Sequence, residues 1–164
     1  MFKRILVPLD GSHLAEVALQ PACELAARFD GEITLLRVTS TPLVFSQIDG
    51  STNAELLVTM REHNRKEAEE YLNGMKGSLR QQGYIVHTHL LEDEGPADAI
   101  LATVEAQGMD IVVMSTHGRG GVARWVFGSV ADRVLRYSPV PVLLMRAETD
   151  TERSDQTVAA SEAV

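Results

Sequence analysis

Short apolar runs alternate with amphipathic segments along most of the chain. The runs have the length of buried strands and are bounded by polar or glycine residues. They cover Arg4–Leu9, Glu32–Val38, Tyr84–Glu92, Asp110–Ser115 and Val140–Arg146. The segments between them place apolar residues at the spacing of one helix face. This alternation predicts an α/β fold, in which helices cover both faces of a parallel sheet.

Several helix ends are marked by residues with known positional preferences. Ser12 is a candidate N-cap for the helix that follows the first strand, and Gly31 is expected to end that helix. Pro21 lies inside the same apolar pattern and predicts a kink or slight break. Pro96 and Gly108 bound the helix that follows the third strand.

A longer helical stretch is expected to end near Gln82, although Gly74 and Gly77 weaken it. Its apolar line consists of Ala68, Tyr71, Leu72, Met75 and Leu79. In the last helix, Ser129 and Asp132 have the spacing of a capping box.

Composition and charge narrow the class of protein. The chain has 164 residues, 45% of them hydrophobic, and a net charge of −8, which disfavours nucleic acid as a partner. Its single cysteine, Cys23, excludes an intramolecular disulfide and suits a reducing compartment. No apolar run is long enough for a signal peptide or a membrane span. We therefore expect a cytoplasmic protein with one domain over residues 1–146 and a disordered acidic tail over 147–164.

Ligands of parallel α/β sheets bind beyond the carboxyl ends of the strands, where the strand order reverses. The segments expected there are Asp10–Ser12, Val38–Thr39, Glu92–Gly95 and Ser115–Ser129. The last of these belongs to "MSTHGRGGVARWVFGSV", residues 114–130, which contains two groups of glycines.

The glycine segment has the composition of a phosphate cradle. Gly118 follows a strand, whereas Gly128 and Ser129 precede a helix whose N-terminal dipole favours an anion. Arg119 and Arg124 supply positive charge at its rim. The alternative is that the glycines only form turns, since "GRGGVA" follows the fourth strand rather than the first and no P-loop motif is present.

The longer pattern is more specific. The spacing Ser115-x2-Gly118-x9-Gly128-Ser129 resembles that of the universal stress protein family, whose nucleotide-binding members carry Gly-x2-Gly-x9-Gly-Ser/Thr after the fourth strand. The resemblance extends to "ILVPLDGS", "LLRV" and "PVPVLLMR" and covers roughly Met1 to Arg146.

The resemblance implies a three-layer α/β/α sandwich with a five-stranded parallel sheet in the order 3-2-1-4-5, Rossmann-like and similar to the adenine nucleotide alpha hydrolases. It implies binding of ATP, or of ADP or AMP, with Mg²⁺. The residues that it assigns to the nucleotide are Pro8, Leu9, Asp10, Val38, Met114, Ser115, His117, Gly118, Arg119, Gly128, Ser129 and Val130. Asp10 would accept hydrogen bonds from ribose hydroxyls or help to hold the metal through water.

The sequence departs from the family pattern at Ser115, where the pattern has its first glycine. If this position requires a positive φ, serine costs about 1 kcal/mol. If glycine serves only for close approach, a small serine fits.

The resemblance and the apolar last strand together predict a homodimer. An exposed strand such as Val140–Met145 at a sheet edge invites pairing with the same strand of a second copy. His87 and His89 share one face of a strand, which is metal-ligand geometry, but two histidines without a third ligand more often belong to a half-exposed strand face.

Three functions remain open at this level. The first is a stress-response regulator or sensor that binds ATP without turnover. The second is a slow ATPase or autokinase, for which the sequence offers phosphate ligands but no evident base. The third is a dimeric interaction module that binds no nucleotide.

Overall fold

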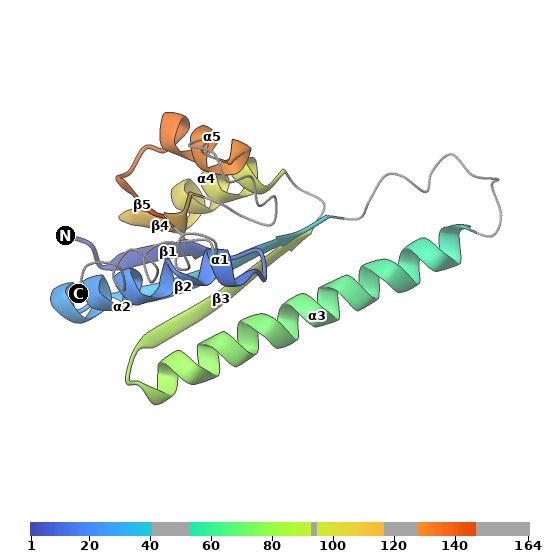
Figure 1. Cartoon of the computed structure of the whole chain (residues 1–164), viewed down its shortest axis with the longest axis horizontal. Helices are drawn as coiled ribbons and strands as arrows, with labels where there is room; N and C mark the ends of the chain where they lie inside the picture. The colour runs from blue at the N-terminus through green and yellow to red at the C-terminus, as the bar shows by residue number, and fades with distance from the viewer. Residues whose placement is uncertain (41–52, 93–94, 117–127, 147–164) are drawn as a thin grey trace, which may run out of the picture.

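The computed structural model describes residues 1–40, 53–92, 95–116 and 128–146. All four pairings between neighbouring strands are parallel. The strands are β1 (Arg4–Pro8), β2 (Glu32–Thr39), β3 (Ile85–Glu92), β4 (Ile111–Ser115) and β5 (Val142–Met145). Their order in the sheet is β3-β2-β1-β4-β5, which confirms the predicted topology (Figure 1).

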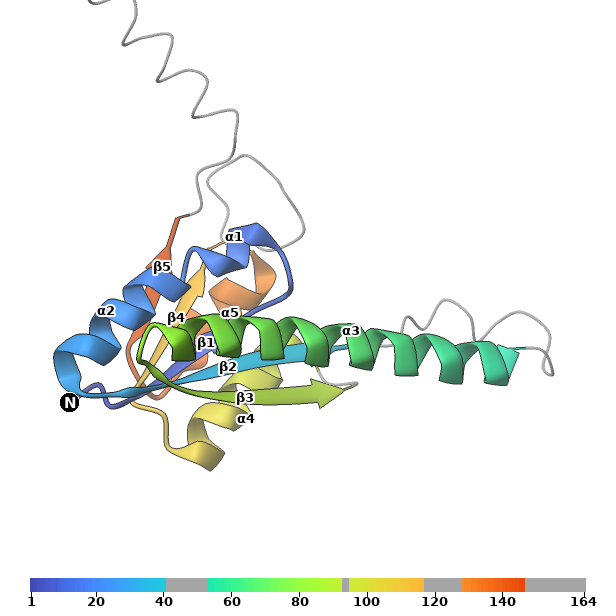
Figure 2. The same cartoon turned by 90° about the horizontal axis from the view of Figure 1, so that it is seen from below.

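Helices cover both faces of this sheet, which gives three layers (Figures 1 and 2). One face carries α1 (His13–Glu16), α2 (Leu19–Phe29) and α3 (Asn53–Gln81), and the other carries α4 (Pro96–Gln107) and α5 (Ser129–Tyr137). Each face has its own hydrophobic core, because side chains of a strand alternate between the two sides. Ile5 and Val7 enter the first core, whereas Leu6 enters the second.

The helix after β1 is interrupted at Val17 and Ala18, one turn before Pro21. The sequence correctly predicted a break but misplaced it. Proline lacks an N–H group, and in a continuous helix its ring clashes with the carbonyl four residues earlier, that of Val17. The chain therefore breaks at this carbonyl, and Pro21 lies in the first turn of α2.

The prediction that Gly31 ends this helix is wrong by one residue. Asp30 adopts the left-handed conformation with φ 51°, and α2 ends there. Gly31 is needed for a different reason, since a Cβ at this position would lie 2.9 Å from the backbone oxygen of Lys3. The glycine thus allows the α2–β2 turn to pass close to the chain that enters β1.

The other helix ends test the capping predictions. Ser12 caps α1, since its Oγ accepts a hydrogen bond from the Ala15 N–H at 3.3 Å. Gly108 ends α4 in the left-handed conformation, as predicted. The capping box at Ser129 is wrong, because Gly128 is the N-cap of α5 and makes no side-chain bond. The Asp132 carboxylate instead accepts from Arg136 one turn later.

The long helix α3 is continuous over the predicted region, and its apolar line packs against β2 and β3 in the first core. Its N-terminal end reaches beyond the arrowheads of β2 and β3 (Figures 1 and 2). The middle of α3 therefore passes the carboxyl end of β2, where it adds side chains to the ligand edge of the sheet.

Candidate functional site

The strand order reverses between β1 and β4. The connection after β1 leads through α1 and α2 to β2 on one side, whereas the connection after β4 leads through α5 to β5 on the other. Asp10 follows β1 and Ser115 ends β4. A crevice at such a switch point is the usual ligand position in open α/β sheets.

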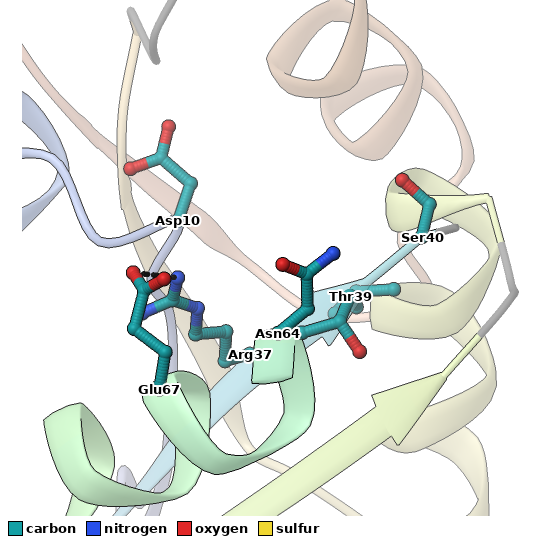
Figure 3. Close-up of a pocket in the computed structure, with 7 residues that line it drawn as sticks. Asp10, Arg37, Thr39, Ser40, Asn64 and Glu67 are labelled. Atoms are coloured by element: carbon teal, nitrogen blue, oxygen red, sulfur yellow. Dashed lines mark ion pairs between the residues drawn. The ribbon is translucent and has the colours of Figure 1, made fainter. Parts of the chain in front are cut away.

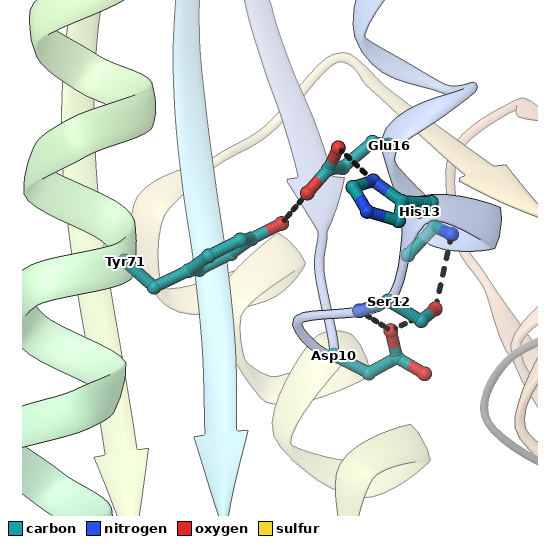
Figure 4. A network of polar contacts seen from close by, with 6 residues as sticks. Asp10, Ser12, His13, Glu16 and Tyr71 are labelled. Atoms are coloured by element: carbon teal, nitrogen blue, oxygen red, sulfur yellow. Dashed lines mark hydrogen bonds and ion pairs between the residues drawn. The ribbon is translucent and has the colours of Figure 1, made fainter.

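The loop after β1 is fixed by its own polar groups (Figure 4). Asp10 Oδ1 accepts hydrogen bonds from the Ser12 backbone N–H at 2.9 Å and the Ser12 hydroxyl at 2.6 Å. Gly11 between them has φ +85°, and a Cβ there would lie 2.8 Å from the Arg37 guanidinium. The Asp10 carboxylate is therefore held in one orientation at the edge of the sheet.

A cleft of about 200 Å³ opens beside Asp10 (Figure 3). Its other walls come from the end of β2 and from the middle of α3. The lining residues are Asp10, Arg37, Val38, Thr39, Ser40, Asn64 and Glu67. The cleft is mainly polar, with two carboxylates, one guanidinium, one amide and two hydroxyls.

Arg37 is the one charged residue among the buried side chains of β2, and only 6% of its surface is exposed. It follows Ile33 and Leu35 on the face of β2 that points toward α3. Its Nη2 lies 3.6 Å from Glu67 Oε1, and its Cζ lies 5.0 Å from the centroid of the Tyr71 ring. An ion pair and a cation–π contact thus stabilise the buried charge.

Tyr71 contacts this cation with its ring and reaches α1 with its hydroxyl, and Figure 4 shows the bond to Glu16. Its hydroxyl donates to Glu16 Oε1 at 2.9 Å, and Glu16 Oε2 lies 3.1 Å from His13 Nδ1. Burial raises the pKa of Tyr71 far above its ordinary value, and the hydrogen bond to Glu16 and the charge of Glu16 raise it further. The phenol therefore remains a hydrogen-bond donor that joins α3 to α1.

The glycine segment is closed at its base. The Gly128 N–H donates to the Thr116 oxygen at 2.9 Å, and the Thr116 N–H donates to the Met145 oxygen at 2.9 Å. The Gly128 N–H is thus engaged within the protein, so the donors that α5 offers an anion are the next N–H groups of its first turn, beginning at Ser129.

Ser115 is buried at the end of β4 and is not strained. Among the residues described, Asp30 alone adopts a positive φ without being glycine. Serine therefore costs no left-handed strain at this position.

The structure brings some of the predicted site residues together. Asp10 and Val38 line the same cleft, while Ser115, Gly128 and Ser129 lie at the ends of the glycine segment. Half-buried Pro8 ends β1, and buried Leu9 donates its N–H to the Leu36 oxygen at 2.8 Å. The second core contains Met114, with Val38 and Val130 packed against it. His117, Gly118, Arg119 and the tail over 147–164 lie outside the described residues.

The sequence prediction missed Arg37, Asn64 and Glu67 as site residues. A signal for Arg37 was present, since it is a charged residue at an inward position of an otherwise apolar strand. Asn64 and Glu67 are three residues apart and so share a helix face, but nothing in the sequence placed that face against β2.

Other candidate sites gain no support. His87 pairs with Glu32 on the neighbouring strand, with Nε2 3.1 Å from Oε2. In the part of the chain that the structure describes, no three His, Cys, Asp or Glu side chains gather as a metal cluster. Over the same residues, no helix has the length and apolar character needed to cross a bilayer.

The fold is that of a doubly wound α/β protein, with a polar cleft beside Asp10 and the carboxyl end of β2. Comparison with known proteins identifies its family. Residues 1–146 match the universal stress protein family, and the chain belongs to it. The universal stress protein MJ0531 of Methanocaldococcus jannaschii is 33% identical over 149 residues, which are 89% of this chain and 83% of that protein.

Solved structures of other proteins have the same fold as this chain. The hypothetical protein MJ0577 superposes with a TM-score of 0.78 at 27% identity, over 92% of this chain and 99% of that one. Two more distant universal stress proteins are nucleotide complexes. One was solved with cAMP, with a TM-score of 0.65 and 18% identity over 89% of this chain and 98% of that one. The other, from Archaeoglobus fulgidus, was solved with dAMP, with a TM-score of 0.59 and 21% identity over 88% of this chain and 98% of that one.

Proposed function

We propose that this protein binds ATP as a stress-response regulator of the cytoplasm and acts as a homodimer. The observation that carries the proposal is the fixed Asp10 carboxylate, which follows β1 at the switch point and lines the cleft. A nucleotide laid across this edge would place its nucleoside near Asp10 and Val38. Its phosphates would lie at the first turn of α5, whose dipole favours an anion. The cAMP and dAMP complexes of distant relatives support an adenine nucleotide as the ligand class.

Mg²⁺ fits the same edge. In nucleotide sites this ion is held by one or two carboxylates together with phosphates and waters, rather than by a full cage of protein ligands. Asp10 would supply such a carboxylate beside the phosphates. The ion would neutralise phosphate charge and so raise the affinity of an acidic protein for an anionic ligand.

The first test is a ligand inventory. Protein purified without added nucleotide is denatured, and the released small molecules are separated by anion exchange and identified by mass. Near-stoichiometric ATP, ADP or AMP is the expected result, and the ATP-to-ADP ratio reports any slow hydrolysis. A chain that releases no nucleotide and gives no calorimetric heat with Mg-ATP would refute the proposal.

The second test is the variant Asp10→Asn. Asparagine keeps an acceptor for the Ser12 N–H but loses the charge, so we expect Mg-ATP affinity to fall about tenfold or more, the equivalent of one hydrogen bond with a charged partner. The control is Asp98→Asn, since Asp98 is an exposed carboxylate of α4 paired with Arg133. Equal affinities for the two variants would remove Asp10 from the site.

A further inference from the structure

Tyr71 is connected to both ends of the segment that runs from Asp10 through α1. Its hydroxyl donates to Glu16 Oε1 at 2.9 Å near the end of this segment, and Figure 4 shows the phenol reaching across from α3. The centroid of its ring lies 5.0 Å from Arg37 Cζ, and the Arg37 guanidinium lies against Gly11 near the start of the segment. One residue of α3 is thus linked to the segment at two points.

The contact between Arg37 and Gly11 is close. A Cβ on Gly11 would lie 2.8 Å from Nη1, 3.0 Å from Cζ and 3.1 Å from Nη2 of Arg37. The guanidinium therefore fills the space that a side chain at position 11 would take. Gly11 also has φ +85°, so glycine is required here both by the backbone conformation and by the approach of Arg37.

The other sides of Arg37 are held by α3. Its side chain is only 7% exposed, and its Nη2 lies 3.6 Å from Glu67 Oε1, while the Tyr71 ring flanks its Cζ. A guanidinium removed from water is costly unless charged or aromatic groups contact it, so these contacts keep the side chain in place. A movement of the Gly11 backbone would therefore be passed to α3 rather than absorbed by a free side chain.

Asp10 is joined to the same turn. Its Oδ1 accepts hydrogen bonds from the Ser12 N–H at 2.9 Å and the Ser12 hydroxyl at 2.6 Å. Ser12 Oγ also accepts from the Ala15 N–H at 3.3 Å, which connects the turn to α1. A ligand or metal ion held by Asp10 would therefore act on the whole segment.

We propose that Arg37 is a positioning residue that couples the Asp10 turn to α3, so that α3 responds to what Asp10 holds. Arg37 acts here by packing against Gly11 and not by contact with a ligand. The N-terminal end of α3 extends beyond β2 and β3, so a response of this helix reaches a part of the surface outside the site (Figures 1 and 2). The response to a ligand rests on the proposed function, whereas the coupling does not.

The coupling is tested first without ligand, in the variant Arg37→Met, which keeps an unbranched side chain but loses the guanidinium. Amide hydrogen exchange is followed residue by residue by NMR. We expect the hydrogen-bonded amides of Ser12 and Ala15 to exchange roughly tenfold faster, the effect of losing about one net hydrogen bond or cation–π contact on local opening. The amides of β4 should change by less than about twofold, because the effect is local.

Arg65→Met is the matched control. It removes the same charge, but Arg65 pairs with Glu69 on the surface of α3, so the Ser12 amide should keep its wild-type rate. A second variant, Arg37→Lys, keeps the buried charge and is less disruptive to the fold. Lysine lacks the flat group that lies against Gly11, so this variant should show the same local acceleration as Arg37→Met.

The same measurement with saturating Mg-ATP tests whether α3 responds to the ligand. In the wild-type protein and in Arg65→Met, the amides of α3 around Tyr71 should exchange severalfold more slowly when the ligand is bound. In Arg37→Met this slowing should be lost. Each protein is compared at saturation, so a weaker affinity of the variant does not produce the loss.

The outcomes separate this inference from the proposed function. Wild-type rates at Ser12 and Ala15 in both Arg37 variants refute the coupling, as does an equal acceleration over the whole sheet, which would make Arg37 a general stabiliser. A wild-type protein that binds Mg-ATP without any change in α3 refutes the response alone, as does an Arg37→Met variant that keeps the slowing. A wild-type protein that binds no Mg-ATP refutes the proposed function and the response together, and the comparison without ligand still decides the coupling.

Discussion

Tyr71 contacts a charged residue of the candidate cleft with its ring and a carboxylate of α1 with its hydroxyl. Its ring lies against the Arg37 guanidinium, and its hydroxyl donates to Glu16 at 2.9 Å. The raised pKa of this phenol means that the folded protein keeps the proton where the unfolded chain, with an ordinary value of 10.0, releases it. The stability that this provides is therefore complete below about pH 10 and is lost as pH rises above that value.

The substitution Tyr71→Phe tests this linkage. We expect it to lower the free energy of unfolding by about 1 kcal/mol at neutral pH, the net contribution of one hydrogen bond. Above pH 10 the wild-type protein should lose up to about 1.4 kcal/mol more per pH unit than the variant, because one additional proton is released on unfolding. Urea unfolding at pH 8 to 11 measures both effects.

The control for this experiment is Tyr137→Phe at an exposed position of α5, where 68% of the tyrosine is accessible. Parallel pH profiles for the wild-type protein and Tyr71→Phe would show that the phenol is not protected by the fold.

The role of a residue was predictable from the sequence where that role depends on the residue's own chemistry and its neighbours along the chain. Ser12 and Gly108 act at helix ends as their chemistry dictates. The role of Arg37 was not predictable, because it depends on Tyr71 and Glu67 from a helix about thirty residues away along the chain. A buried charge is tolerated only where tertiary partners meet it, and these are set by the fold.

At the scale of elements, two glycines have different effects because they lie in different structural contexts. Gly31 allows the α2–β2 turn to pass within contact distance of the chain before β1. Gly74 lies in α3, where a Cβ would meet no other described part of the chain within 4 Å beyond the backbone of the helix itself. The first glycine is required by close approach, and the second only weakens its helix.

The two alanine variants should therefore act in opposite directions. Gly31→Ala would set a methyl group 2.9 Å from the Lys3 oxygen and should destabilise the protein by about 1 to 3 kcal/mol, the usual cost of overpacking. Gly74→Ala should stabilise it by about 0.5 to 1 kcal/mol through helix propensity alone. Urea unfolding curves at one pH measure both changes, and effects of the same sign would contradict this account of the α2–β2 turn.

Hydrophobic periodicity correctly predicted the order and type of the helices and strands, but it did not always predict the residues at which helices begin and end. The break near Pro21 lies at Val17 because the clash acts on the carbonyl one turn earlier. Ser129 was predicted as a cap from spacing alone, yet Gly128 holds that position because its N–H closes the glycine segment onto Thr116. Local rules predicted each element, and contacts between elements set its limits.

At the scale of the whole molecule, the sheet has two edges of different character. β3 runs along α3, which packs against it, whereas β5 is short and pairs through one of its edges with β4. Leu143 in β5 is 36% exposed, and the other three residues of this strand are only partly buried. An apolar edge strand of this kind favours pairing with a second copy. In a two-fold antiparallel pair the β5 strands would run side by side, with the Leu143 side chains close to each other.

The substitution Leu143→Lys tests this dimer. Like charges facing each other across paired strands are destabilising, so we expect the wild-type protein near 36 kDa, twice the 17.9 kDa of one chain, and the variant near the monomer mass. Light scattering coupled to size exclusion gives these masses directly. Ile85→Lys is the matched control, since Ile85 is 60% exposed on β3 at the opposite edge. It introduces the same charge and should leave the dimer intact. If Leu143→Lys remains dimeric while Ile85→Lys becomes monomeric, the two copies pair through β3, and the cleft between β2 and α3 would lie close to the interface rather than far from it.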